Sequence, residues 1–383
     1  MTLITDTASL AAFCDRMKGV DFITVDTEFM RETTYWAKLC LVQVGGPDEA
    51  VCIDPLAPDI NLKPLYDMMA DHSLLKIFHA GRQDLEIFFT ATSAVPAPVF
   101  DTPIAAMVCG VGDQVGYEAL VSKLAGANLD KSQRFTDWAQ RPLTERQITY
   151  ALGDVTHLRK VYLALKKRLE KTGRASWLDE EEAVLTSPDT YKVDPREMWR
   201  RLRARTRAPR MLAVLRELAA WRELTAQALD MPRQRVAKDD AILELAANMP
   251  ITIDDIKRSR LAKPLASGKY AEGVLAAVAK GRAVPDADCP RLDSDGWDTQ
   301  APRAVVELLK LLLKARSEAN DVAQRLIATS DELDEIAQSD TADVPCLHGW
   351  RRELFGEDAL KLKRGKLAIG LSASGKSVEV FER

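Results

Sequence analysis

The stretch FITVDTEFMRE, residues 22–32, places Asp26 and Glu28 at the end of an apolar, β-branched run. Successive side chains of a strand point to opposite faces, so these two carboxylates point the same way and lie close together. Like charges so close repel each other, and a divalent metal ion is a strong neutraliser of such a pair. An exposed strand end entering a turn explains the same pattern, so the choice depends on other acids in the chain.

Length and charge limit the classes of protein to consider. A chain of 383 residues is long enough for two or three domains, and 46% hydrophobic with 29% charged residues is typical of a soluble globular protein. The net charge of -4 argues against a protein that coats nucleic acid with its whole surface. A polyanion could be bound only by a local basic surface.

The cysteines and the N-terminus indicate the compartment. The six cysteines are scattered without a C-x-x-C pair, which predicts reduced core residues and no zinc site. The sequence has no signal-peptide pattern at its N-terminus and no apolar segment long enough to span a membrane. We therefore expect a cytoplasmic protein that does not bind a membrane.

Short β-rich runs alternate with helical patterns in the first part of the chain. Four runs predict strands, and the first three are close enough to form a meander: residues 22–28, 37–45, 50–55 and 74–80. Residues 117–126 and a long segment from about Glu145 read as helices. The pattern predicts a mixed α/β domain over residues 1–170.

Beyond Lys171 the strand signal disappears and helical patterns take over. We expect a basic connecting helical segment (171–207), a helical domain (208–283), an exposed linker rich in Pro, Asp and Gly (284–299), and a second helical domain (300–383) that ends in a possible strand. APRMLAVLREL from Ala208 aligns with APRAVVELLKL from Ala301, which predicts two copies of one module. Shared amphipathic periodicity could produce part of this match.

Further acids occur where helices are predicted to begin or to cover the core. Asp84 falls in the first turn of a helix after a strand and a turn, where an acid also serves as a partner of the helix dipole. Thr144 and Gln147 form a capping-box pattern, and Tyr150 and Asp154 share one face of the helix that follows. An Asp beside an apolar stripe is costly unless something binds it.

The order of these motifs resembles the DEDD exonuclease superfamily in its tyrosine-bearing branch. D-x-E ends a strand, an Asp opens a helix, and Y-x-x-x-D lies on a later helix. Within the superfamily the chain is most similar to the bacterial ribonuclease D family, on stretches such as FHAGRQDLEIF and FDTPIAAMVCG and over nearly the whole chain. The resemblance implies a ribonuclease H-like exonuclease domain followed by two all-α HRDC domains.

The resemblance also implies roles for the five motif residues. Asp26 is expected to bridge two divalent ions, Mg²⁺ or Mn²⁺, while Glu28 and Asp154 complete the site of the water-activating ion. Asp84 is expected to support the second ion, partly through water, and Tyr150 to orient the attacking water. The implied activity is a metal-dependent 3'-5' exoribonuclease that releases nucleoside 5'-monophosphates and trims tRNA precursors and other structured RNAs.

Basic residues outside these motifs are weaker candidates for RNA binding. One group, which also includes Trp138, precedes the third motif, and the other belongs to the arginine-rich stretch at residues 196–210: Lys131, Gln133, Arg134, Arg141, Arg200, Arg203 and Arg207. A Trp138 buried in the core and cations that merely face solvent are the alternative.

Three functions remain open at this point. The first is the exoribonuclease, with an RNA bearing a single-stranded 3' end as its partner and no obligate protein partner. The second is a 3'-5' DNA exonuclease of the proofreading or helicase-associated kind, whose metal site would look the same. The third is a nonenzymatic RNA-binding protein on a decayed nuclease fold, which the presence of all five motif residues disfavours.

Overall fold

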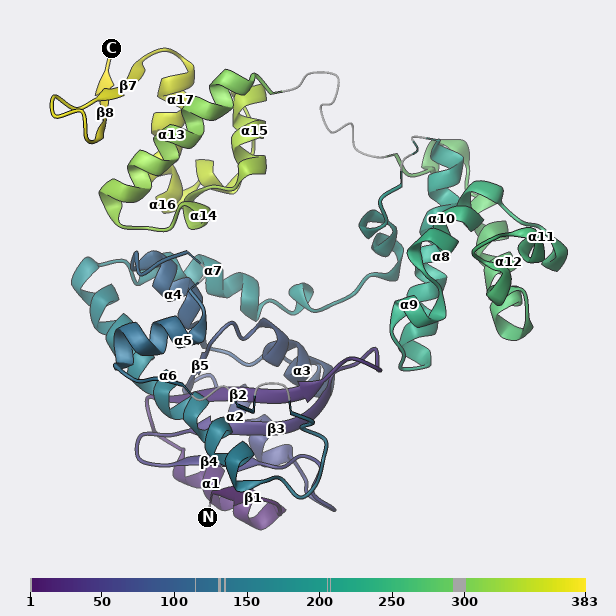
Figure 1. The fold of residues 1–383 in the computed structure, drawn as a ribbon, viewed down its shortest axis with the longest axis horizontal. Helices are drawn as coiled ribbons and strands as arrows, with labels where there is room; N and C mark the ends of the chain where they lie inside the picture. The colour runs from purple at the N-terminus through teal and green to yellow at the C-terminus, as the bar shows by residue number, and fades with distance from the viewer. Residues whose placement is uncertain are drawn as a thin grey trace. The chain divides into compact units, whose positions relative to one another are not determined.

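A computed structural model describes residues 2–113, 115–129, 132–133, 136–204, 206, 208–291 and 301–383. The chain forms two compact units (Figure 1). The first unit contains Met1–Glu28, Cys40–Tyr191 and Gly296–Arg383, and the second contains Phe29–Leu39 and Lys192–Asp295. The segment that follows the D-x-E motif therefore belongs to the second unit, although the motif itself belongs to the first.

A six-stranded mixed sheet is the centre of the first unit. Its order is β1-β4-β3-β2-β5-β6, with the bounds Leu3–Ile4, Phe22–Met30, Lys38–Gly45, Ala50–Ile53, Leu75–Phe78 and Val99–Asp101 for β1 to β6. β1 pairs with β4, β2 with β5, and β5 with β6 in parallel, whereas β3 and β4 are antiparallel. The four predicted strands are confirmed, and the short strands β1 and β6 extend the sheet at its edges.

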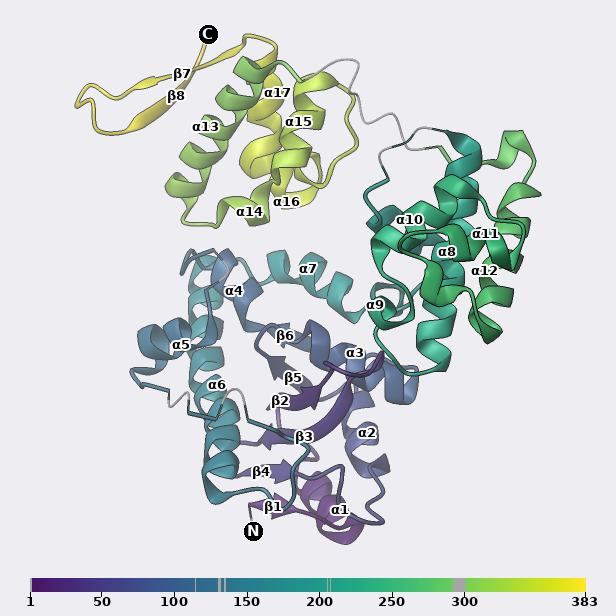
Figure 2. The ribbon, with the colours of Figure 1, turned by 45° about the vertical axis from the view of Figure 1, so that its right-hand side comes forward.

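Helices cover both faces of this sheet. Figure 2 shows α6 on one side and α1, α2 and α3 on the other. The helices of this part are α1 (Thr7–Arg16), α2 (Lys63–Ala70), α3 (Arg82–Thr92), α4 (Thr102–Val108), α5 (Tyr117–Leu120), the π-helix η1 (Val121–Ala125), α6 (Glu145–Thr172) and α7 (Ser176–Thr186). The predicted capping box is present, since Thr144 and Gln147 exchange hydrogen bonds, and α6 begins directly after it.

The second unit is helical around a core of its own. A short 3-10 helix η2 (Pro188–Thr190) ends the first unit's segment, and the second unit contains η3 (Pro195–Arg201), α8 (Pro209–Ala228), α9 (Arg233–Val236), α10 (Asp239–Asn248), α11 (Ile253–Arg258), η4 (Lys263–Leu265), α12 (Gly268–Arg282) and η5 (Asp286–Asp288). Its core combines apolar residues of α8, α10 and α12 with Trp199 of η3. We call residues 208–283 the first helical module.

Residues 301–383, which we call the second helical module, belong to the first unit. They form α13 (Arg303–Asn320), α14 (Gln324–Ile327), α15 (Ser330–Gln338), η6 (Pro345–Leu347), α16 (Gly349–Arg351), η7 (Arg352–Gly356) and α17 (Glu357–Lys363). An antiparallel hairpin of β7 (Leu367–Leu371) and β8 (Val378–Glu382) follows, where the sequence indicated a strand. The predicted α/β fold followed by helical domains is confirmed, while the domain boundaries stay a prediction.

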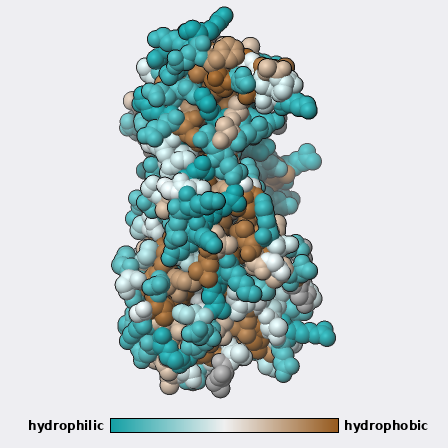
Figure 3. All heavy atoms as spheres, turned by 90° about the vertical axis from the view of Figure 1, so that its left-hand side faces the viewer, coloured by the Kyte–Doolittle hydropathy of each residue, from teal (hydrophilic) through white to brown (hydrophobic). Residues whose placement is uncertain are grey.

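The surface agrees with the polar composition. Figure 3 shows hydrophilic residues over most of one face of the molecule, with apolar residues scattered between them. Among the helices that the structure describes, none combines the length and the apolar character that crossing a membrane requires.

Candidate active site

Strand β2 and helix α6 bring three acidic side chains together. Asp26 and Glu28 lie on one face of β2, and Asp154 lies on α6, which covers that face. One potential ligand atom from each of the three carboxylates lies within 4.8 Å of the others. The Thr24 hydroxyl donates to the carbonyl of Val155 at 2.9 Å, so a hydrogen bond fixes the strand to the helix next to Asp154.

Asp84 approaches this cluster from helix α3, which follows β5, the neighbour of β2 on the other side of the sheet. It is buried in the first turn of α3 and accepts a short hydrogen bond from the Thr27 hydroxyl. Thr27 stands between Asp26 and Glu28, so the strand that carries the D-x-E motif also holds Asp84. The three closest carboxylates do not include Asp84. Burial, and then the charge of Asp26, raises the pKa of Asp84 well above its usual range, so this acid still lies near the cluster.

Burial and mutual repulsion raise the pKa values of the acids in this cluster. Burial, and then the charge of Asp154, raises the pKa of Asp26 well above its usual range. Burial, followed by the charges of the other acids, raises the pKa of Glu28 to about 9, and burial raises the pKa of Asp154 to about 7. A bound divalent cation would oppose these shifts, because its charge favours the ionised carboxylates.

Tyr150 and Asp154 line the same hollow along α6. Residues from one face of the helix form one wall, and residues 128, 129 and 132 form the other; the helix contributes Glu145, Arg146, Thr149, Tyr150, Gly153, Asp154 and His157. The ring of Trp138 lies beside the ring of Tyr150, with centroids 6.1 Å apart. The hollow therefore opens onto both residues of the third motif.

Of the basic residues before the third motif, Arg141 lies in the described part of the chain and contributes to structure. Arg141 donates to both carboxylate oxygens of Asp54 at 2.7 Å and to the carbonyls of Cys40 and Trp138. Trp138 is only 3% exposed, as the core alternative predicted. Gln133 donates to the Ser132 hydroxyl at 3.2 Å. Contacts of Gln133 and Arg141 with RNA stay a prediction.

The arginine-rich stretch is divided between internal ion pairs and exposed positions. Arg196 pairs with the buried Glu217 at 2.9 Å, and Arg200 pairs with Glu197 at 2.6 Å. Arg203 is exposed. Three of the predicted RNA-binding residues lie outside the described residues: Lys131, Arg134 and Arg207.

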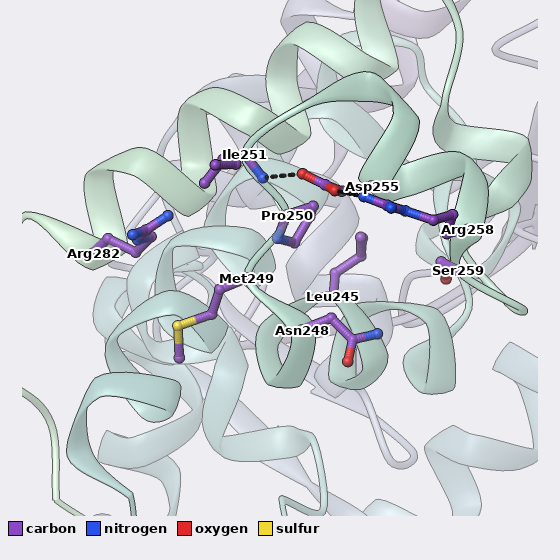
Figure 4. A pocket seen from close by; sticks show the side chains of 9 residues that line it. All are labelled: Leu245, Asn248, Met249, Pro250, Ile251, Asp255, Arg258, Ser259 and Arg282. Atoms are coloured by element: carbon purple, nitrogen blue, oxygen red, sulfur yellow. Dashed lines mark hydrogen bonds and ion pairs between the residues drawn. The ribbon is translucent and has the colours of Figure 1, made fainter.

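A second hollow belongs to the first helical module (Figure 4). Asp255, which faces it, accepts hydrogen bonds from the backbone N–H of Ile251 and from Arg258. Hydrogen bonds, the Thr252 hydroxyl first among them, lower the pKa of Asp255 to about 2. This carboxylate caps α11 as part of a capping box, so it serves the helix and forms no second acidic cluster.

Comparison with known proteins identifies the family. Residues 1–170 match the 3'-5' exonuclease family, and residues 211–278 match the HRDC domain. The chain is 49% identical to ribonuclease D of Granulibacter bethesdensis, over 99% of this chain and 96% of that protein. It is 50% identical to ribonuclease D of Jannaschia sp., over 99% of each chain.

A solved structure extends the likeness to the fold. The crystal structure of Escherichia coli RNase D, described as an exoribonuclease involved in structured RNA processing, superposes with a TM-score of 0.80 at 29% identity. The match covers 95% of this chain and 98% of that one. The chain belongs to the ribonuclease D family and is a 3'-5' exoribonuclease.

Proposed function

We propose that the enzyme hydrolyses RNA with two divalent ions, Mg²⁺ or Mn²⁺, held by Asp26, Glu28, Asp84 and Asp154. The observation that carries this proposal is the set of three carboxylates with ligand atoms within 4.8 Å of one another. Carboxylate oxygens are hard ligands, which suit these ions better than zinc or copper. The raised pKa values also support it, because a cation offsets the cost of ionising acids that burial and mutual repulsion disfavour.

We assign each side chain a separate task. Asp26, Glu28 and Asp154 offer oxygens to the ions, and Thr27 holds the Asp84 carboxylate in place from β2. When bound, the two ions supply a water of lowered pKa and stabilise the leaving oxygen. The Tyr150 hydroxyl orients the attacking water, since it lines the same hollow as Asp154. The products are nucleoside 5'-monophosphates.

The substrate that we propose is a structured RNA with a single-stranded 3' tail, tRNA precursors in particular. The support comes from the Escherichia coli relative, which is described as acting in structured RNA processing and covers nearly all of this chain. We propose that the enzyme acts in the cytoplasm. The proposal includes no protein partner.

The test is a comparison of Asp26→Asn with the wild type and with Asp15→Asn, on a 3'-tailed tRNA precursor and on a matched tailed DNA. Asp15 is an exposed acid that pairs only with the neighbouring Lys18 in the described structure, so its loss should leave the rate unchanged. Asp26→Asn should abolish the stepwise ladder of shortened RNA while keeping RNA affinity and the melting temperature. Hydrolysis by Asp26→Asn at a near-normal rate would refute the metal site, and equal rates on DNA would refute the preference for RNA.

A further inference from the structure

Gln43 is a buried amide without a hydrogen bond. It lies on β3 and is 0% exposed, and neither its Nε2 nor its Oε1 has a hydrogen-bond partner among the residues that the structure describes. Its neighbours along the strand, Leu41, Val42 and Val44, are apolar and equally buried. A buried amide that lacks partners destabilises a core, so a leucine or methionine would serve packing better.

The sheet places Gln43 next to Asp26. β2 and β3 are neighbours in the sheet, and residues 31–37 are too short a connection for a parallel crossover, so the two strands are antiparallel. The Thr24 hydroxyl donates to the carbonyl of Gly45, which identifies these two residues as neighbours. In an antiparallel pair, two residues forward from Thr24 on β2 lie opposite two residues back from Gly45 on β3. Asp26 is therefore beside Gln43, with its side chain on the same face.

Strand β4, which pairs with β3, shows that this is the face of the sheet that α6 covers. Gln43 is paired with Cys52 of β4, and the Cys52 Sγ lies 4.0 Å from the carbonyl of Ile148 on α6. Burial, and then the charge of Glu28, raises the pKa of the Cys52 thiol to about 12. Gln43 thus lies in the layer between the sheet and α6, the same layer that contains the acidic cluster.

We propose that Gln43 is a positioning residue whose side-chain amide donates a hydrogen bond to the Asp26 carboxylate. This inference rests on the proposed metal site. An amide donor fixes the rotation of the carboxylate oxygens, as the outer partners of metal-binding side chains commonly do. The otherwise unexplained buried amide then has a function beside the acidic cluster.

Gln43→Met tests this because methionine matches the length of the side chain and removes only the amide. Val44→Ala on the same strand is the control, since it loosens the core without changing a polar group. Thermal unfolding is measured without metal and over a Mn²⁺ titration, and kcat and KM are measured on a 3'-tailed RNA. Gln43→Met should melt higher than the wild type without metal, need about 10- to 100-fold more Mn²⁺ for its thermal shift, and lose kcat with an unchanged KM.

The outcomes separate a positioning role from a merely structural one. Val44→Ala should melt lower and keep the wild-type Mn²⁺ midpoint. If Gln43→Met keeps both the wild-type Mn²⁺ midpoint and the wild-type kcat, the positioning role is wrong while the metal site stands. If the wild type itself neither responds to Mn²⁺ nor hydrolyses RNA, the proposed function fails, and this inference fails with it.

Discussion

The two helical modules have the same build and different attachments. In each, a long helix is followed by a one-turn helix and a medium helix: α8, α9 and α10 in the first module, and α13, α14 and α15 in the second. Each long helix begins within an Ala-Pro-Arg sequence and is soon followed by an aspartate with positive φ, Asp230 at 47° and Asp321 at 52°. These matching details support the predicted internal repeat.

The two cores show how far the copies have diverged. The first module packs around its own core, which includes Trp199. The second module shares one continuous core with the nuclease fold, in which Leu309 and Phe355 join Phe100 and Leu165. Trp350 of the second module stacks on Trp177 of α7, with ring centroids 4.3 Å apart and planes 7° apart. A repeated module can therefore become part of a catalytic unit while its copy remains a separate body.

The largest expected effect comes from removing one tryptophan of each core. Trp350 is 8% exposed and Trp199 is 2% exposed, so each change to alanine should cost about 3–5 kcal/mol of local stability. Trp350→Ala should deprotect amides of α6 and α7, whereas Trp199→Ala should deprotect α8, α10 and α12. Hydrogen exchange read by mass spectrometry measures both. Equal deprotection of α6 by the two variants would show that the modules are not attached differently.

The aspartates that follow the long helices offer a finer comparison. Asp230 accepts hydrogen bonds from the backbone N–H groups of Tyr35 and Trp36, at 3.0 Å each, and so fixes the segment after β2 to the first module. Asp321 pairs with Arg168 near the end of α6, at 2.8 Å. The same position of the repeat is thus used twice to hold a segment of the nuclease sequence.

Substituting glycine for Asp230 and for Asp321 should show how much each aspartate contributes to stability. Glycine tolerates positive φ, so each substitution removes the carboxylate without straining the backbone. Asp230→Gly should cost about 1–2 kcal/mol, because two backbone donors lose a charged acceptor, and Asp321→Gly about 0–1 kcal/mol, because its ion pair is exposed. Exchange rates of the Tyr35 and Trp36 amides report on the first variant directly. If these amides exchange no faster in Asp230→Gly, the aspartate does not hold the segment.

Local patterns allowed much of the site to be predicted. The spacing of Asp26 and Glu28 follows the strand period, and that of Tyr150 and Asp154 follows the helix period, so each pair could be assigned to one face. The capping box fixed the start of α6 for the same reason. Asp84 was also named, but no local pattern indicated the hydrogen bond from Thr27 of β2 that holds its carboxylate.

Contacts between distant segments could not be predicted. The partner of Arg141 is Asp54, 87 residues earlier, and nothing near Arg141 in the sequence indicates an ion pair rather than a surface cation. The contact of the second module with the nuclease fold could not be predicted either, since its buried apolar positions follow the same helical period as those of the first module. Gln43 stood in a correctly predicted strand, but its lack of partners emerges only once the neighbouring strands are placed.

Helix α7 is one of the elements through which the second module contacts the nuclease fold. Arg351 of the second module pairs with Glu180 and Glu181 of this helix. The next residue, Glu182, is partly buried and accepts a hydrogen bond from the backbone N–H of Asp101 at the end of β6. Burial raises the pKa of Glu182 to about 8, so this side chain tends to keep its proton at neutral pH.

The smallest expected effect is a change in how the first unit's stability depends on pH. Because the pKa of Glu182 is raised in the folded state, its stabilising contribution is complete below pH 4.5 and is lost as the pH rises through about 8. Glu182→Gln keeps a neutral acceptor for Asp101, so its stability advantage over the wild type should grow from pH 5 to pH 8 and then level off. We expect about 1 kcal/mol in total, since solvent screens a partly exposed carboxylate.

Urea unfolding at several pH values measures this stability advantage. Asp179→Asn, which changes an exposed acid of the same helix, is the control that should show no such growth. An advantage that stays constant with pH would mean that Glu182 does not titrate between α7 and β6.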